Sequence, residues 1–271
     1  MSLTQESCSG WIGQDTVSIA GLTVPKQTVG VITKQTPTLF KGTDLDGIIG
    51  MGFRAMSQLN GPTFVDGLFR GGQISQPIFG LYLTPKSVGN AQLTLGGTDP
   101  SKYTGNINFL PVDARKPYWN VPFQSITVNG RPSKVQPQVA VADSGTAGMI
   151  APVGDAKAIY SLISPNIVVL DPRGAYGIKC TELAGLNATI TFMMGGKPYT
   201  IPSKELSVGP YPDQPGKTGM CQTLINSDRS LNFWIIGESL LKYYYTVWDM
   251  GNRQNGVAPR LGFATTAHSP A

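Results

Sequence analysis

The stretch VAVADSGTAGMIAP, residues 139–152, places a carboxylate in a tight turn between two apolar runs. Burying a charge between such runs costs free energy unless hydrogen bonds or a chemical task keep it there. Gly145 lets the backbone approach the Asp143 carboxylate closely. The hydroxyl of Thr146 can orient the same carboxylate, and Ser144 completes the turn. These residue types predict acid–base chemistry at Asp143; the simpler interpretation is an aspartate that only caps a turn.

Metal-dependent chemistry has few candidate ligands in this sequence. The only histidine is His268, in a polar tail, and no two of Cys8, Cys180 and Cys221 have Cys-X-X-Cys spacing. A His/Cys zinc site is therefore not expected, and we predict neither a metal nor a cofactor. The cysteines are either three buried thiols, or Cys180 pairs with Cys221, closing a loop worth about 4 kcal/mol in the chain-entropy model.

Charge and hydropathy limit the partners. The net charge is +5, but the 21 lysines and arginines are scattered rather than clustered with aromatic residues, so we expect no nucleic-acid partner. No apolar run reaches the ~18 residues of a membrane span, so we expect no membrane partner.

Residues 1–10 do not have the pattern of a signal peptide, which indicates either a cytosolic chain or a missing true beginning. Asn187 begins an Asn-Ala-Thr glycosylation sequon, a weak indication of a secretory route.

The elements that must position Asp143 are predicted to be short strands. Charged residues make up only 14% of the chain, while 33 glycines and 21 prolines favour tight turns. Apolar patterning predicts strands over residues 11–19, 27–32, 77–83, 91–97, 106–112, 125–130, 188–194 and 243–249. Short helices are expected at 63–69, 155–163 and 238–244. The fold class is therefore all-β with a few short helices.

Two segments that lie far apart in the sequence share a pattern, which suggests internal symmetry. DGIIGMGF (residues 46–53) and WIIGESLL (residues 234–241) share two aliphatic residues, a glycine and then a short helical segment. Both are expected to be buried strands that end at the glycine. They are either unrelated or counterparts in two lobes of one β protein.

Taken together, these segments resemble the pepsin-like aspartic peptidases. Residues 143–147 are similar to that family's Asp-Thr/Ser-Gly-Thr active-site turn, and residues 233–237 to the strand packed under it. Further segments match in order along essentially the whole chain: 46–50, 95–99, 103–105, 118–119, 244–249 and 261–264.

The resemblance implies a two-lobed β-barrel architecture. Residues 1–84 would be a remnant of the N-terminal lobe, and residues 85–271 the interlobe strands and the C-terminal lobe. It also implies a disulfide between Cys180 and Cys221, an aspartic endopeptidase activity on a peptide or protein substrate, and an extracellular or vacuolar location. Asp143 would be catalytic, with Ser144, Gly145 and Thr146 forming its turn.

The sequence also departs from the family pattern, and these departures affect the expected activity. The family has one such turn in each lobe and a tyrosine-bearing flap, whereas Asp143 is the sole aspartate of this chain in an Asp-Ser/Thr-Gly sequence. Residues 8–13 resemble the strand after the flap, with only residues 1–7 before them. We therefore expect a fragment or truncated gene model whose isolated chain is inactive, because one carboxylate supplies half of the catalytic pair. The alternatives are a non-catalytic peptide-binding protein and a homodimeric peptidase in which two chains each contribute Asp143.

Overall fold

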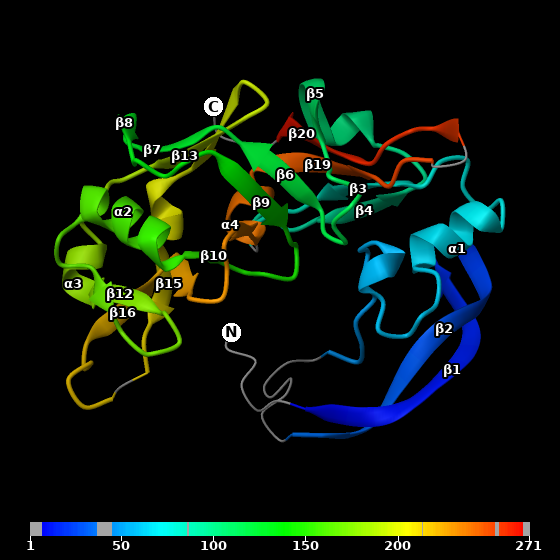
Figure 1. Cartoon of the computed structure of the whole chain (residues 1–271), viewed down its shortest axis with the longest axis horizontal. Coiled ribbons are helices and arrows are strands. Elements are labelled where there is room, and N and C mark those ends of the chain that lie inside the picture. The colour runs from blue at the N-terminus through cyan, green and yellow to red at the C-terminus, as the bar shows by residue number, and fades with distance from the viewer. Residues whose placement is uncertain (1–6, 37–44, 86, 213, 253–254, 268–271) are drawn as a thin grey trace.

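The computed structural model describes residues 7–36, 45–85, 87–212, 214–252 and 255–267, and Figure 1 shows their arrangement. Strands dominate and the helices are short, which confirms the predicted all-β class. The α-helices are α1 (Phe64–Arg70), α2 (Val153–Ile163), α3 (Cys180–Leu183) and α4 (Glu238–Leu241). Single 3₁₀ turns cover Arg54–Met56, Pro100–Lys102 and Ser203–Leu206.

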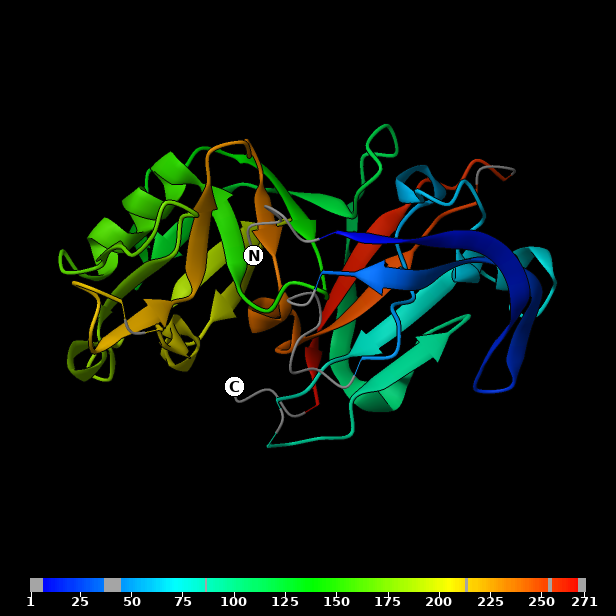
Figure 2. The same ribbon diagram turned by 90° about the horizontal axis from the view of Figure 1, so that it is seen from below.

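The N-terminal part begins with a long antiparallel hairpin of β1 (Cys8–Ile19) and β2 (Leu22–Gln35). Ala20 and Gly21 form its turn with positive φ angles of 51° and 83°. The turn end packs against α1 through the buried side chain of Val24, while most of the hairpin is exposed. In Figure 2, which views the molecule from below, the hairpin lies in front of a sheet in the middle of the molecule.

That middle sheet joins two segments that lie far apart in the sequence, residues 78–111 and 244–266. Its order is β4-β3-β19-β20-β5, with bounds β3 (Ile78–Tyr82), β4 (Gln92–Leu95), β5 (Tyr103–Pro111), β19 (Tyr244–Asp249) and β20 (Arg260–Thr266). All neighbouring pairs are antiparallel, and β3 lies against β19 with Ile78 opposite Asp249. The sheet includes strands from both sides of the boundary expected near residue 84; that boundary stays a prediction.

The remaining three sheets are built from strands between residues 120 and 236, the part of the chain expected to form the C-terminal lobe. One has the order β17-β10-β18-β9-β6, from β6 (Asn120–Phe123), β9 (Gln138–Ala142), β10 (Met149–Pro152), β17 (Ile225–Asp228) and β18 (Trp234–Ile236). The second, β14-β13-β7-β8, contains β7 (Ser125–Val128), β8 (Arg131–Pro132), β13 (Ile190–Met194) and β14 (Lys197–Ile201). The third, β11-β12-β16-β15, contains β11 (Val168–Val169), β12 (Tyr176–Lys179), β15 (Ser207–Pro210) and β16 (Met220–Thr223).

Aromatic rings fill the centre of this lobe. Trp234 of β18 is fully buried and meets Phe192 of β13 and Phe123 of β6 edge-on, with centroid distances of 5.4 and 6.5 Å. The indole N–H of Trp234 donates to Asp155 Oδ2 (2.9 Å) at the start of α2, so the buried ring keeps its hydrogen bond. Trp234 thereby anchors β18 in the core through both packing and a hydrogen bond.

The predicted strands and helices lie where expected, with two differences. The helix expected over 238–244 ends at Leu241, because Tyr244 already begins β19. The buried strand expected to end at Gly50 is wrong: residues 45–51 form no strand, and Ile48 is 73% exposed. Its counterpart β18 is paired on both sides, by β9 and β10, whereas no described strand pairs with Ile48 or Ile49. Aliphatic character alone therefore did not produce burial at that position.

Candidate active site

The Asp143 turn links β9 to β10, and β18 lies between those two strands. Trp234–Ile236 runs parallel to Ala140–Ala142 and antiparallel to β10. The N–H of Asp143 donates to the carbonyl of Ile236 (3.0 Å), which ties the start of the turn to the end of β18. Asp143 is half-buried, and Ser144 beside it is exposed. The turn is thus held from beneath and open above.

Gly237, directly after β18, is what allows the turn to sit so close. Its N–H donates to the carbonyl of Gly148 (3.1 Å), and the next N–H, of Glu238, donates to the carbonyl of Thr146 (2.8 Å). A Cβ at Gly237 would overlap both of those carbonyl oxygens. The aliphatic-aliphatic-glycine pattern therefore has a steric reason: only glycine fits under the turn.

Both oxygens of the Asp143 carboxylate accept hydrogen bonds from within the turn. Gly145 N–H donates to Oδ1 (2.9 Å), and the Thr146 hydroxyl donates to Oδ2 (2.6 Å). A Cβ at Gly145 would come within 3.2 Å of Oδ1, a tight contact. Each oxygen keeps further acceptor capacity on its other lone pair. The carboxylate is oriented but not saturated, which suits a group that must exchange a proton with water.

Apolar side chains form a cavity of about 300 Å³ next to the carboxylate. Trp119 and Trp248 stand edge-to-face (5.3 Å), and Trp119 donates its indole N–H to the carbonyl of Met51 (3.0 Å). Both indoles are almost fully buried, and both border this cavity. The cavity is lined by Ile49, Met51, Gly52, Phe79, Leu81, Leu93, Trp119, Ala142, Asp143, Ser144 and Trp248.

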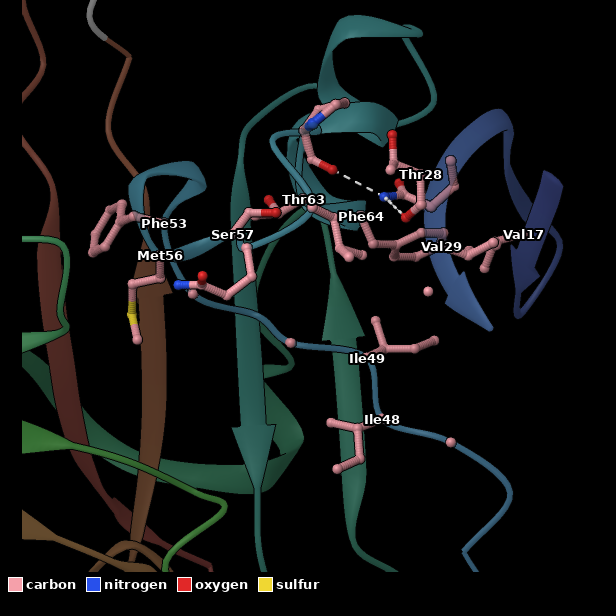
Figure 3. A pocket seen from close by; sticks show the side chains of 18 of the residues that line it. Val17, Thr28, Val29, Ile48, Ile49, Phe53, Met56, Ser57, Thr63 and Phe64 are labelled. Carbon is pink, nitrogen blue, oxygen red and sulfur yellow. Dashed lines mark hydrogen bonds between the residues drawn. The ribbon is translucent and has the colours of Figure 1, made fainter. Parts of the chain in front are cut away.

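A larger hollow of about 800 Å³ lies between the hairpin and residues 46–64, as Figure 3 shows. Val29 and Phe64 face Ile49 across it. The side-chain N–H₂ of Gln27 donates to the carbonyls of Pro62 (2.9 Å) and Thr28 (3.2 Å), whereas its buried oxygen has no partner among the described residues. The hollow meets the smaller cavity at Ile49, which lines both.

The residues predicted for the active-site turn, the disulfide and the glycosylation site lie at three different places in the structure. Asp143, Ser144, Gly145 and Thr146 form one turn, as their sequence requires. Cys180, at the start of α3, is bonded to Cys221 of β16, so the expected disulfide is present. Cys8 is a free, exposed thiol, which excludes the alternative of three buried ones. Asn187 is exposed in the loop between α3 and β13.

The described residues contain no group of three or more His, Cys, Asp and Glu side chains that could hold a metal, while His268 lies outside them. No helix within the described ranges is long and apolar enough to cross a membrane. What the geometry offers chemically is therefore the oriented carboxylate of Asp143 beside an apolar cavity.

Comparison with known proteins identifies the family of this chain. A family model described as eukaryotic aspartyl protease matches residues 2–260. The chain belongs to this family. Cathepsin E of Aquarana catesbeiana is 29% identical over 267 residues, covering 96% of this chain and 64% of the relative. Chymosin of Camelus dromedarius is 30% identical over 258 residues (94% and 64%), and pepsin-2B of Gadus morhua 30% over 251 residues (92% and 74%). The chain thus spans 64% of the length of the first two relatives.

Sequence reasoning missed the wall of the cavity beside Asp143. Phe79 and Leu81 come from β3 and Leu93 from β4, far from the turn in sequence. Their alternation predicted strands, but nothing in the sequence paired those strands with β19 or brought them to Asp143. The one available signal was the set of matches to the family, which places all of these segments in one fold.

Proposed function

We propose that this chain supplies the Asp143 half of the catalytic site of an aspartic endopeptidase, which hydrolyses peptide bonds in a peptide or protein substrate. The observation that carries the proposal is the orientation of the Asp143 carboxylate by Gly145 and Thr146, inside a turn whose sequence resembles the active-site turn of this family. The chemistry needs two carboxylates about 3 Å apart, as in pepsin, where the pair shares one proton.

In this mechanism the charged carboxylate draws a proton from a bound water, which attacks the substrate carbonyl while the protonated partner donates to the carbonyl oxygen. The two bonds to Asp143 fix the plane of its carboxylate. The apolar wall with Trp119 and Trp248 lowers the local dielectric and so strengthens the interaction of the carboxylate with water and substrate. No step requires a covalent intermediate.

The second carboxylate belongs, in this proposal, to polypeptide outside the described residues. Among the described side chains that line the smaller cavity, Asp143 is the only carboxylate. Support for an added segment comes from Ile48 and Ile49, which are 73% and 49% exposed and line the large hollow, whereas their counterparts in β18 are covered by the two strands that carry the Asp143 turn. An equivalent pair of strands around Ile48 would deliver a second turn to the same cavity.

That polypeptide is either a further segment of the same protein or a second chain. Intact-mass analysis of the protein from its source separates the two. A mature species heavier than 28.9 kDa with peptides upstream of Ser2 identifies a further segment. A species of 28.9 kDa that forms a dimer and cleaves peptides identifies a second chain.

The activity itself is tested with a fluorogenic peptide at acid pH. The 271-residue chain alone, as a monomer, is expected to cleave nothing measurable, and the complete assembly is expected to cleave. Asp143→Asn should abolish that cleavage, whereas Asp228→Asn, at an exposed aspartate whose side chain accepts hydrogen bonds from Ser230, should not. Cleavage that survives Asp143→Asn contradicts the proposed role of Asp143. Cleavage by the monomeric chain that is lost in Asp143→Asn contradicts the need for a partner carboxylate.

A further inference from the structure

The loop between α3 and β13 carries Asn187, whose side chain is exposed to solvent. Asn187 is exposed, while Ala188 next to it is only 4% exposed and Leu183 before it 7%. These buried neighbours anchor the loop, so its backbone is fixed while the Asn187 side chain points outward. Within the described part of the chain, the side-chain amide of Asn187 makes no hydrogen bond.

A clamp from the neighbouring hairpin holds the loop in this position. Asn129, in the turn between β7 and β8, donates its side-chain N–H to the carbonyl of Asn187 (3.3 Å). Its side-chain oxygen accepts from the N–H (2.8 Å) and the hydroxyl (3.3 Å) of Thr189. Asn129 has φ of 49°, a conformation that asparagine tolerates better than most residues. The clamp uses the backbone of Asn187 and leaves its side chain free.

We infer that Asn187 is a site of N-linked glycosylation. Asn187-Ala188-Thr189 is the only Asn-X-Ser/Thr sequence in the 271 residues, and it occupies an exposed loop, as an acceptor site requires. The disulfide between Cys180 and Cys221 is a second, independent observation, because such bonds form in the oxidising compartments where glycosylation takes place.

The donor is an oligosaccharide carried on a polyprenyl pyrophosphate. The side-chain nitrogen of Asn187 forms a bond to the anomeric carbon of the first sugar. The bond between that carbon and the pyrophosphate oxygen breaks, and its electron pair leaves with the pyrophosphate. The amide gives up one proton to a base of the transferase.

The folded protein accommodates this modification without rearrangement. A sugar on the side-chain nitrogen of Asn187 displaces no hydrogen bond within the described residues, because the clamp contacts only its carbonyl. The flanking elements, α3 and the β7–β8 end of the sheet, lie toward the outer end of the C-terminal lobe, away from the turn after β9 (Figure 1). A glycan there leaves the Asp143 cavity open.

Translation of the whole chain behind a cleavable leader peptide into microsomes from the endoplasmic reticulum tests the site without requiring a stable fold. The wild-type chain should show one mobility shift that an endoglycosidase removes. Asn187→Gln and Thr189→Ala should abolish the shift, while Thr189→Ser, which keeps the sequon, should retain it. An unshifted wild-type chain, or a shift that persists in Asn187→Gln, overturns the inference.

The protein from its source provides the second measurement. After reduction, trypsin releases residues 180–204, because Lys197 is followed by Pro198 and resists cleavage. This peptide should be detected only after treatment with peptide N-glycosidase, with Asn187 converted to aspartate. Detection of the peptide with an unmodified Asn187 as the major species in untreated protein would contradict the inference.

Discussion

Gly237→Ala tests whether the Asp143 turn depends on a residue without a side chain. The added methyl group would overlap the carbonyl oxygens of Thr146 and Gly148, both backbone atoms that cannot rotate away. The turn must move, and the hydrogen bonds from Gly237 N–H (3.1 Å) and Glu238 N–H (2.8 Å) are then lengthened or lost.

The expected loss in the free energy of unfolding follows from those contacts. Overpacking a well-filled interior costs about 1–3 kcal/mol, and each lost backbone hydrogen bond contributes about 1 kcal/mol. The variant should therefore lose about 2–5 kcal/mol in free energy of unfolding, a large share of the 5–15 kcal/mol that is usual for a folded domain. Urea denaturation followed by tryptophan fluorescence measures this directly, since Trp234 in the adjoining strand is fully buried.

Gly154→Ala is the matched control. A Cβ at Gly154 meets no atom within 4 Å, and the residue lies in the first turn of α2. This variant should be neutral or more stable by up to about 1 kcal/mol, because alanine loses less conformational entropy in a helix. If Gly237→Ala unfolds within about 0.5 kcal/mol of the wild-type chain, a difference typical of surface substitutions, the steric argument for this glycine is refuted.

Three further predictions each concern one bond of the structure: Thr146 to Asp143, Cys180 to Cys221, and Arg115 to Asp113 (2.8 Å). Thr146→Val removes the hydroxyl that donates to Asp143 and should lower the free energy of unfolding at neutral pH by about 1 kcal/mol, while Thr146→Ser should not; urea titration of both variants decides. Reduction of the disulfide at Cys180 should destabilise the chain by up to about 4 kcal/mol, seen as a lower Tm with reductant, and a Tm unaffected by reductant would contradict it. The hydrogen bond from Arg115 lowers the pKa of Asp113 from 3.8 to about 2, so its contribution to stability is present above the ordinary value and lost as the pH falls toward 2. Asp113→Asn should therefore reduce Tm at neutral pH and leave it unchanged near pH 2; an equal loss at both pH values would argue against the ion pair.

Local patterns in the sequence predicted much of this fold. Alternation placed the strands, and the helix expected over 155–163 is α2 almost to the residue, because its apolar positions Ala156, Ile159 and Tyr160 are buried on one face. The turn at Asp143 and the glycine at Gly237 were also identified, since both are local motifs with a steric cause.

Most of the predictions that failed concerned residues whose structural partners are distant in the sequence. The isoleucines at 48 and 49 predicted burial, but burial requires neighbouring strands, and none of the described ones pairs with them. The helix α3 was missed because Cys180–Leu183 is a single turn, too short for any periodicity to show. The assembly of the cavity wall from β3 and β4 could not be predicted from patterns along the chain, because alternation carries no information about which strand a strand will pair with.

The middle sheet also has a consequence for biosynthesis. Ile78 pairs with Asp249, and Tyr103 with Thr266, so β3 and β5 find these neighbours only after a long further stretch of the chain has been synthesised. During translation β3 and β5 cannot pair with β19 and β20 until those two strands have been synthesised. All strands of the β17-β10-β18-β9-β6 sheet, in contrast, have been synthesised once Ile236 has emerged. The strands between residues 120 and 236 can therefore form most of their core first, and the sheet that ties them to β3 and β5 closes only after β19 and β20 have emerged.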